Sequence, residues 1–257
     1  MIALKPFEKI LFFVLGILIG SFLNVCIYRI PKHEDITTTR SHCLSCGNVI
    51  KWYDLIPVLS YILLRGRCRL CKAKLSVQYP IIELLNGVLY CIVFYVLGMS
   101  VQSVLIMLLA SALIVIAVID WRTYEIPFGL NVFIAVLGIV SVVCKLINHD
   151  FTGIIDNLAG AVSVSGFLLI LFLVTKGRGI GGGDIKLMAA AGLLLGVKSI
   201  ILAFIMGCVL GSVIHVIRMK ISKADHVLAF GPYLAVGIFI AGLWGEVIVN
   251  AYLSTFI

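Results

Sequence analysis

The sequence has few charged residues, and this scarcity excludes an ordinary soluble domain. Asp, Glu, Lys and Arg make up 12% of the 257 residues, whereas soluble domains contain about 25%. Apolar residues make up 62%, which is more than a packed soluble core requires. Internal repeats and low-complexity tracts are also absent. The sequence therefore predicts a membrane protein that crosses the bilayer several times.

The basic residues are not interleaved with aromatic residues, although the net charge is +8. Nucleic-acid binding, the competing explanation for a basic protein, is therefore disfavoured, and loops that face the cytoplasm explain the charge better. A small-residue cleavage site is missing after the first apolar segment. We therefore expect that segment to be a retained span rather than a signal peptide.

Hydropathy predicts about eight apolar helices, most of them close to the roughly 20 residues that a transmembrane helix needs. Their approximate bounds are 10–30, 80–98, 101–119, 127–147, 154–175, 185–197, 199–217 and 227–254. The fold class is therefore an all-α polytopic membrane protein. We expect three parts, which are a first transmembrane helix (1–30), a small insert (31–79) and a transmembrane bundle (80–257).

Lys and Arg gather on one side of this arrangement. Nine of them are Arg29 and residues of the loop 31–80. Placing that loop in the cytoplasm puts seven more on the same side: Arg122, Lys176, Arg178, Lys186, Arg218, Lys220 and Lys223. Only four remain outside: Lys5, Lys9, Lys145 and Lys198. The positive-inside rule therefore predicts a cytoplasmic insert and two termini on the opposite side.

Two C-x-x-C motifs lie in the insert, CLSC at 43–46 and CRLC at 68–71, each beside a glycine that suits a tight turn. Paired motifs of this kind are typical of sites in which four thiolates bind one Zn²⁺. Two disulfides or redox chemistry are the alternatives, but a reducing cytoplasm disfavours disulfides. The motifs therefore predict a structural zinc site with four ligands: Cys43, Cys46, Cys68 and Cys71. We expect the remaining cysteines to be apolar packing residues: Cys26, Cys91, Cys144 and Cys208.

Two aspartates stand at the ends of predicted spans. Asp120 ends the third span, and Asp184 follows the glycines 181–183 at the start of the sixth. A carboxylate at that depth is costly unless it faces a partner or water. One interpretation is a pair of interfacial carboxylates that snorkel or pair with Arg122 and Lys186.

The other interpretation is an aspartyl protease, in which two carboxylates on facing helices share a proton. One activates water, and the other polarises the scissile carbonyl. Glycines beside Asp184 would keep access to it open. Helix dipoles favour charge on Asp184, at a helix N-terminus, and disfavour it on Asp120, at a C-terminus. We therefore expect Asp184 to be ionised and Asp120 to carry the proton.

Four other polar features of the sequence suggest a role. Asn24 is expected to form an interhelical hydrogen bond, and Arg29 to be a snorkelling anchor. Glu83 is either a helix-start carboxylate that the dipole favours or part of an active site. The stretch KWYDLIP (51–57) is either a turn at the membrane interface or part of a pocket for a methyl donor or a substrate amine.

Beyond these motifs, the chain resembles the bacterial type IV prepilin peptidases along nearly its whole length. The family belongs to the GxGD-type intramembrane aspartyl proteases. Asp120 with Ile-Pro six residues later matches the family pattern. So do five further stretches: GSFLNVCIYRIP (20–31), RSHCLSCGNVIKWYDLIPVLSYILLRGRCRLC (40–71), YPIIELLNG (79–87), GIGGGDIKLMAAAG (179–192) and FGPYLAVG (230–237). One departure is visible, because Phe128 and Gly129 stand where the family usually has Asn or Asp.

The resemblance implies a peptidase of the bacterial cytoplasmic membrane that has Asp120 and Asp184 as its catalytic residues. It would cleave the basic leader from prepilins or pseudopilins after a glycine, at the cytoplasmic face. Many relatives then N-methylate the new terminus with S-adenosylmethionine, and the cysteine insert is typical of those bifunctional members. The implied partners are these substrates and membrane lipids, with no nucleic acid. Neither the oligomeric state nor the residues that bind S-adenosylmethionine follow from the sequence.

Two alternatives remain open. The first is a peptidase without methyl transfer, in which the zinc insert is purely structural. The second is a proton-coupled transporter that uses the aspartates for coupling. A transporter predicts acidic residues near the middle of the bilayer, whereas Asp120 and Asp184 lie near the ends of their spans. The sequence therefore favours the peptidase.

Overall fold

The structure is a computed structural model that describes residues 6–177, 179–222 and 228–255. Lys5, Arg178 and Lys223, and the predicted start of the last span at residue 227, lie outside the described residues. The described part is helical, and its only β-pairings are two isolated bridges, His42 with Val49 and Arg67 with Lys74. The chain divides into two compact units, residues 1–103 and 104–257, each of which is considered by itself.

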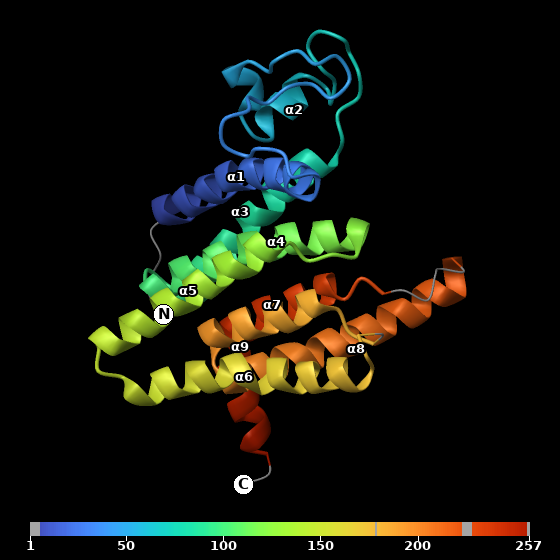
Figure 1. Cartoon of the computed structure of the whole chain (residues 1–257). Coiled ribbons are helices and arrows are strands. Elements are labelled where there is room, and N and C mark those ends of the chain that lie inside the picture. Colours follow the sequence, from blue (N-terminus) through green and yellow to red (C-terminus); the bar gives the residue numbers. More distant parts are fainter. Residues whose placement is uncertain (1–5, 178, 223–227, 256–257) are drawn as a thin grey trace. The chain divides into compact units, whose positions relative to one another are not determined.

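The first unit is built on two long helices that carry the insert between them. Its elements are α1 (Pro6–Arg29), the short turns η1 (Ile30–Lys32) and η2 (Trp52–Leu55), α2 (Leu59–Leu63) and α3 (Gln78–Leu97). Figure 1 labels α1, α2 and α3. The long helices form because their sequences are almost wholly apolar and, apart from Pro6 and Pro80 in the first turns, lack proline.

Helices α1 and α3 approach closely because glycines remove side chains from the contact. A Cβ at Gly16 would lie 2.7 Å from the Cα of Gly87. Side-chain amides then join the helices, because Asn86 Nδ2 donates to Gly16 O at 2.7 Å and Asn24 Nδ2 donates to Tyr79 O at 3.1 Å. The predicted interhelical role of Asn24 is therefore confirmed.

The prediction that Arg29 snorkels toward lipid headgroups is wrong. Its side chain is buried, and its guanidinium donates to the carbonyl oxygens of Asp35 at 2.9 Å and Thr39 at 2.8 Å. The start of the insert has no regular helix or sheet to satisfy these carbonyls, and a guanidinium offers five donors. Arg29 therefore turns inward and folds the segment that follows it.

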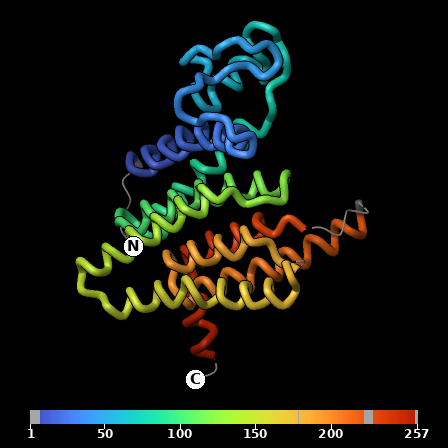
Figure 2. The backbone as a smooth tube through the Cα atoms, viewed as in Figure 1, coloured from blue at the N-terminus to red at the C-terminus, as the bar shows by residue number. Residues whose placement is uncertain are grey.

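The second unit is a bundle whose helices are α4 (Val101–Thr123), α5 (Phe128–Ile147), α6 (Phe151–Val174), α7 (Gly182–Leu195), α8 (Val197–Ser222) and α9 (Gly231–Leu253). Only the first residues of α4 belong to the first unit. Helix α7 packs against α5 and α6, and α8 packs against α9. Figure 2 follows the chain through the α5–α6 hairpin and then back into α7.

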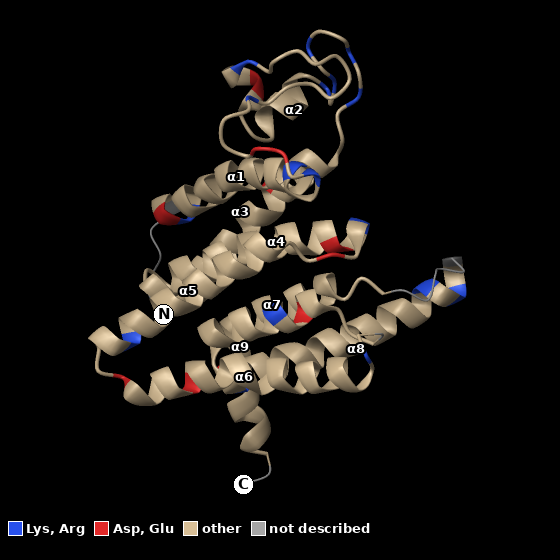
Figure 3. Ribbon diagram, in the orientation of Figure 1, with Lys and Arg blue, Asp and Glu red and all other residues tan. Residues whose placement is uncertain are grey.

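All eight predicted apolar segments are helical in the described residues, and their observed ends differ from the predicted ones by at most five residues. Seven of these helices are long and apolar enough to cross a membrane. The eighth, α7, has only 14 residues. Charged residues are sparse along the helices of the second unit, as Figure 3 shows. The chain is therefore a multi-pass membrane protein, and the division at residues 30 and 79 remains a prediction.

Glycine also governs the contact between α6 and α7. A Cβ at Gly160 would lie 2.6 Å from the carbonyl oxygen of Gly192, which is far inside van der Waals contact. By contrast, a Cβ at Gly166, six residues later in α6, would have its nearest neighbour, a Val162 methyl, at 3.7 Å. Gly160 is therefore a packing requirement, whereas Gly166 has room for a methyl group.

We predict that Gly160→Ala destabilises the protein by about 1–3 kcal/mol, because α6 and α7 must separate to admit the methyl group. The matched variant Gly166→Ala is expected to be neutral or slightly stabilising, since alanine has the higher helix propensity. Thermal unfolding of the purified variants in detergent measures both effects. Equal unfolding temperatures for the two variants would contradict the glycine contact.

Candidate active site and metal centre

Asp120 lies in the last turns of α4 and is almost completely buried, with 5% of its surface exposed. Its Oδ2 atom accepts a hydrogen bond of 2.8 Å from the backbone N–H of Gly231, the first residue of α9. A Cβ at Gly231 would lie 2.8 Å from that same oxygen. The carboxyl group is therefore held in place by a helix N-terminus that only glycine lets approach so closely.

Asp184 is the third residue of α7 and is partly exposed. Helix α7 begins three residues earlier than the sequence predicts, so Asp184 lies inside its first turn. Gly183 packs against the loop before α5, where a Cβ would lie 2.9 Å from Ile126 Cβ. Gly182 faces open space, with no atom within 4 Å of a Cβ built there. The glycine run therefore fixes the helix on one side and leaves room on the other.

The structure brings the two aspartates into electrostatic range of each other, because the charge of Asp120 acts on the carboxyl group of Asp184. Both residues belong to the second unit. Asp184 lies at the N-terminus of α7, as predicted, but Asp120 also meets a helix N-terminus, that of α9. The helix dipoles therefore no longer distinguish the two carboxyl groups, and the reason for placing the proton on Asp120 is lost.

Two buried polar groups near this region were not singled out by sequence reasoning. Asn131 in α5 is 4% exposed, and neither its Oδ1 nor its Nδ2 has a hydrogen-bond partner among the described residues. It lies in the chain between Ile126 of the preceding loop, which is next to Gly183, and Gly138 of α5, which is next to Leu193. The hydroxyl group of Tyr233 in α9 is likewise buried without a partner in the described part. Nothing in the sequence indicates that these side chains are buried.

The residue that departs from the family pattern, Phe128, begins α5 and is exposed. Lys186 Nζ lies 5.1 Å from the centre of its ring, which is within the range of a cation–π contact. A polar residue at this position could not form that contact. Lys186 of α7 therefore has an aromatic partner in the first turn of α5.

The four cysteines of the insert form a compact cluster, and their sulfur atoms all lie within 4.8 Å of one another. Cys43 Sγ and Cys71 Sγ are 3.8 Å apart. A tetrahedral zinc site with Zn–S distances of about 2.3 Å has S–S separations of about 3.8 Å. The eight cysteines are free thiols. The cluster therefore fits a tetrahedral metal ion and does not show the alternative pair of disulfides.

Each C-x-x-C motif sits in the same kind of turn. In the first, Cys43 N–H donates to Asn48 O at 2.9 Å and Gly47 N–H donates to Cys43 O at 2.8 Å. The second repeats the pattern, with Cys68 N–H donating to Ala73 O at 2.8 Å and Lys72 N–H to Cys68 O at 3.1 Å. Lys72 has a positive φ of 59°, like Gly47 at 71°. Lys72 therefore takes the place in the second turn that Gly47 has in the first, whereas Gly66, whose φ of 64° is also positive, packs on the ring of Tyr61.

Backbone N–H groups of the turns favour the thiolate form of two of the four cysteines. Backbone N–H groups of Cys71 and Leu70 lower the pKa of Cys68 to about 7, and the N–H of Asn48 lowers the pKa of Cys46. The N–H of Ala73 acts in the same direction on Cys71, but desolvation and the neighbouring thiols together raise its pKa to about 11. Four thiolates so close together need a cation, and a soft divalent ion such as Zn²⁺ suits them.

Comparison with known proteins identifies the family of this chain. Residues 14–97 match the family model "Bacterial Peptidase A24 N-terminal domain", and residues 107–216 match "Type IV leader peptidase family". Three similar curated proteins are each named "Prepilin leader peptidase/N-methyltransferase". The Pseudomonas putida protein is 33% identical over 91% of this chain and 89% of its own length. The Bacillus subtilis protein is 31% identical over 94% of this chain and 96% of its own length. The Neisseria gonorrhoeae protein is 33% identical over 91% of this chain and 89% of its own length. No solved structure matches the chain.

We predict that the purified protein contains one zinc ion per chain and that Cys68→Ser lowers the zinc content at least about tenfold, because a tetrahedral structural site needs all four ligands. The control is Cys144→Ser, which changes a single cysteine of α5 and should leave the zinc content unchanged. Elemental analysis by mass spectrometry of each detergent-solubilised protein gives the ratio. Equal zinc in both variants, or a folded wild-type protein free of zinc, would rule out the site.

Proposed function

This chain belongs to the type IV leader peptidase family, and from that premise we propose that Asp120 and Asp184 together cleave the leader from type IV prepilins or pseudopilins. The enzyme then N-methylates the new N-terminus with S-adenosylmethionine. One observation supports the catalytic assignment above all. Two carboxyl groups within electrostatic range of each other lie in helices that otherwise carry almost no acidic residues.

In this mechanism the two carboxyl groups share one proton, since two like charges that act on each other do not both ionise readily. The ionised carboxylate takes a proton from a water molecule while the water oxygen attacks the carbonyl carbon of the scissile peptide. The protonated carboxyl group donates its proton to the carbonyl oxygen. When the intermediate collapses, the C–N bond breaks and the leaving amine receives a proton from the carboxyl pair.

The surroundings of Asp120 and Asp184 differ and suggest different roles for the two residues. Asp120 is buried and fixed by Gly231 N–H, so its position does not depend on substrate. Asp184 is partly exposed beside the open space at Gly182, and this is the side from which a peptide can approach. The buried amide of Asn131 is the kind of group that a water molecule or an extended peptide would satisfy. An apolar substrate helix must unwind locally to present its scissile bond there.

The cleavage position and the membrane face complete the proposal. The positive-inside rule supports a cytoplasmic insert, and the same orientation supports a cytoplasmic position for the C-terminal end of α4 and the N-terminal end of α7. Cleavage therefore takes place at the cytoplasmic face of the inner membrane, after a glycine of the leader. The basic insert does not attract the basic leader, and its charge instead suits contact with anionic lipid headgroups.

In the insert, Cys43, Cys46, Cys68 and Cys71 hold a structural Zn²⁺. Four thiolates leave no open coordination position, so the ion supplies folding energy rather than catalysis. A proton-coupled transporter is the competing function, and it needs acidic residues in the middle of the bilayer. Asp120 is three residues from the last residue of α4, and Asp184 is two residues from the first residue of α7. These terminal positions favour the peptidase.

We predict that Asp120→Asn and Asp184→Asn each reduce cleavage of a purified prepilin by at least about 10³-fold, because each removes one half of the acid–base pair. Asp150→Asn is the matched control. Asp150 caps α6 by accepting from Gly153 N–H at 2.9 Å, and asparagine caps equally well. Mass spectrometry of the product's N-terminus reports cleavage and methylation together. If Asp120→Asn and Asp184→Asn both process prepilin normally, the aspartates are not catalytic, and a transporter or a structural role for them is favoured instead.

A further inference from the structure

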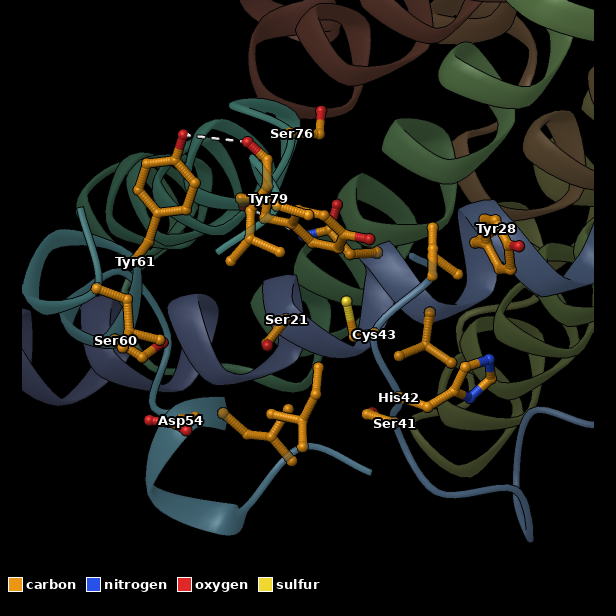
Figure 4. Close-up of a pocket in the computed structure, with 18 of the residues that line it drawn as sticks. Ser21, Tyr28, Ser41, His42, Cys43, Asp54, Ser60, Tyr61, Ser76 and Tyr79 are labelled. Atoms are coloured by element: carbon orange, nitrogen blue, oxygen red, sulfur yellow. Dashed lines mark hydrogen bonds between the residues drawn. The ribbon is translucent and has the colours of Figure 1, made fainter. Parts of the chain in front are cut away.

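A cavity of about 380 Å³ lies within the first unit, between the insert, α1 and the start of α3. Its size falls in the range of about 300–1,000 Å³ that is typical of small-molecule sites. Figure 4 shows side chains from all three segments around it, among them Ser21 of α1, Tyr79 of α3 and Tyr61 of the insert. The peptidase residues Asp120 and Asp184 belong to the other unit and do not line it.

A buried carboxylate lies in the cavity wall, whose other charged residues are Arg29, Asp54 and Lys74. Glu83 of α3 is 6% exposed, and its Oε2 accepts a hydrogen bond of 2.8 Å from Val58 N–H. Val58 has a positive φ of 61°, which is unfavourable for a β-branched residue. The fold therefore holds a strained residue in the position that orients the Glu83 carboxylate. This carboxylate suits a ligand that carries positive charge.

Aromatic rings and hydroxyl groups make up much of the remaining wall. Tyr28, Tyr61 and Tyr79 line the cavity, and Figure 4 shows them spread around it. The Tyr61 ring is held between two contacts, since its hydroxyl group donates to Leu75 O at 3.5 Å and Gly66 packs directly against it. Aromatic faces suit a purine, and side-chain hydroxyls such as those of Ser21 and Ser60 suit a ribose.

The proposed zinc site builds one side of the same cavity. Cys43, which is buried, lines it together with its neighbours 41–45, and residues 73–76 after the second C-x-x-C motif line it as well. Lys74 belongs to this second stretch and is one of the lining residues. Opposite charges are therefore available from two different segments, a carboxylate from α3 and an ammonium from the insert.

We infer that this cavity binds the methyl donor S-adenosylmethionine, with Glu83 facing its sulfonium, tyrosine rings its adenine and Lys74 its carboxylate. The inference rests on the proposed methyl transfer. In that step the deprotonated amine of the cleaved substrate forms the N–CH₃ bond while the donor's C–S bond breaks. Sulfur keeps the electron pair, and the amine's proton passes to solvent. An anionic lipid headgroup is disfavoured as occupant by the charge of Glu83.

Glu83→Gln tests the assignment with little change of shape. The glutamine oxygen can still accept from Val58 N–H, while the charge is lost. We expect the dissociation constant for S-adenosylmethionine to rise at least about tenfold. The constant for S-adenosylhomocysteine, whose sulfur is neutral, should change less. Titration calorimetry on the full-length zinc-loaded protein measures both, and Glu34→Gln, an exposed carboxylate of the insert outside the cavity, is the matched control.

The possible outcomes distinguish a failure of the proposed S-adenosylmethionine site from a failure of the proposed methyl transfer. Unchanged affinity for S-adenosylmethionine in Glu83→Gln overturns the site assignment alone, provided that this variant still cleaves prepilin and is therefore folded. A wild-type protein that cleaves prepilin but neither binds S-adenosylmethionine nor methylates the product overturns the proposed methyl transfer as well. If Glu83→Gln weakens binding of a basic leader peptide instead, the cavity is a substrate site and the inference fails.

A second measurement does not depend on any variant. Ultraviolet cross-linking of radiolabelled S-adenosylmethionine to the wild-type protein, followed by peptide mapping, should place the label in residues 21–83. Label confined to the second unit would overturn the inference. Competition with unlabelled S-adenosylhomocysteine should remove the signal, which distinguishes specific binding from random attachment.

Discussion

The proposed active site depends on one hydrogen bond, which the backbone N–H of Gly231 donates to Asp120. It joins residues 111 positions apart in the chain, the end of α4 and the beginning of α9. A buried carboxylate without a donor would be costly in an apolar bundle, and a side chain at position 231 would push the donor away. The proposed site also requires Asp184 to lie near Asp120, so α7 must be held in position. Glycine contacts of α7 do this, at Gly183 against Ile126 and at Gly192 against α6.

Much of the fold and of the two candidate sites could be predicted from patterns of residues that are close together in the sequence. Long apolar runs predict the helices. The two C-x-x-C motifs predict the thiolate cluster, because each motif forms one short turn. Asp184 stands out because it follows a glycine run. Contacts between distant residues could not be predicted in this way. Gly231 appears in the sequence only as part of FGPY, and the inward turn of Arg29 depends on carbonyl groups whose positions follow from the folded insert.

The two proposed chemistries use different parts of the chain. Asp120 and Asp184 belong to the second unit, whereas the four thiolates and the cavity around Glu83 belong to the first. Each unit also matches its own family model. Cleavage needs an apolar setting with two acids and water, and methyl transfer needs a donor site with mixed charge and aromatic rings. Because the two sites lie in separate units, the residues that one site needs do not constrain the residues of the other.

The central claim is that the carboxyl groups of Asp120 and Asp184 meet at one site, and cross-linking in the membrane tests it most directly. Asp120→Cys and Asp184→Cys are combined in a chain whose single cysteines (26, 91, 144 and 208) are replaced by serine. A short thiol-specific cross-linker is then applied, and the peptides are mapped. The account predicts an efficient intramolecular link between positions 120 and 184, and none when Asp120→Cys is paired with Asp150→Cys. No link at the first pair, with both thiols shown to react singly, would contradict it.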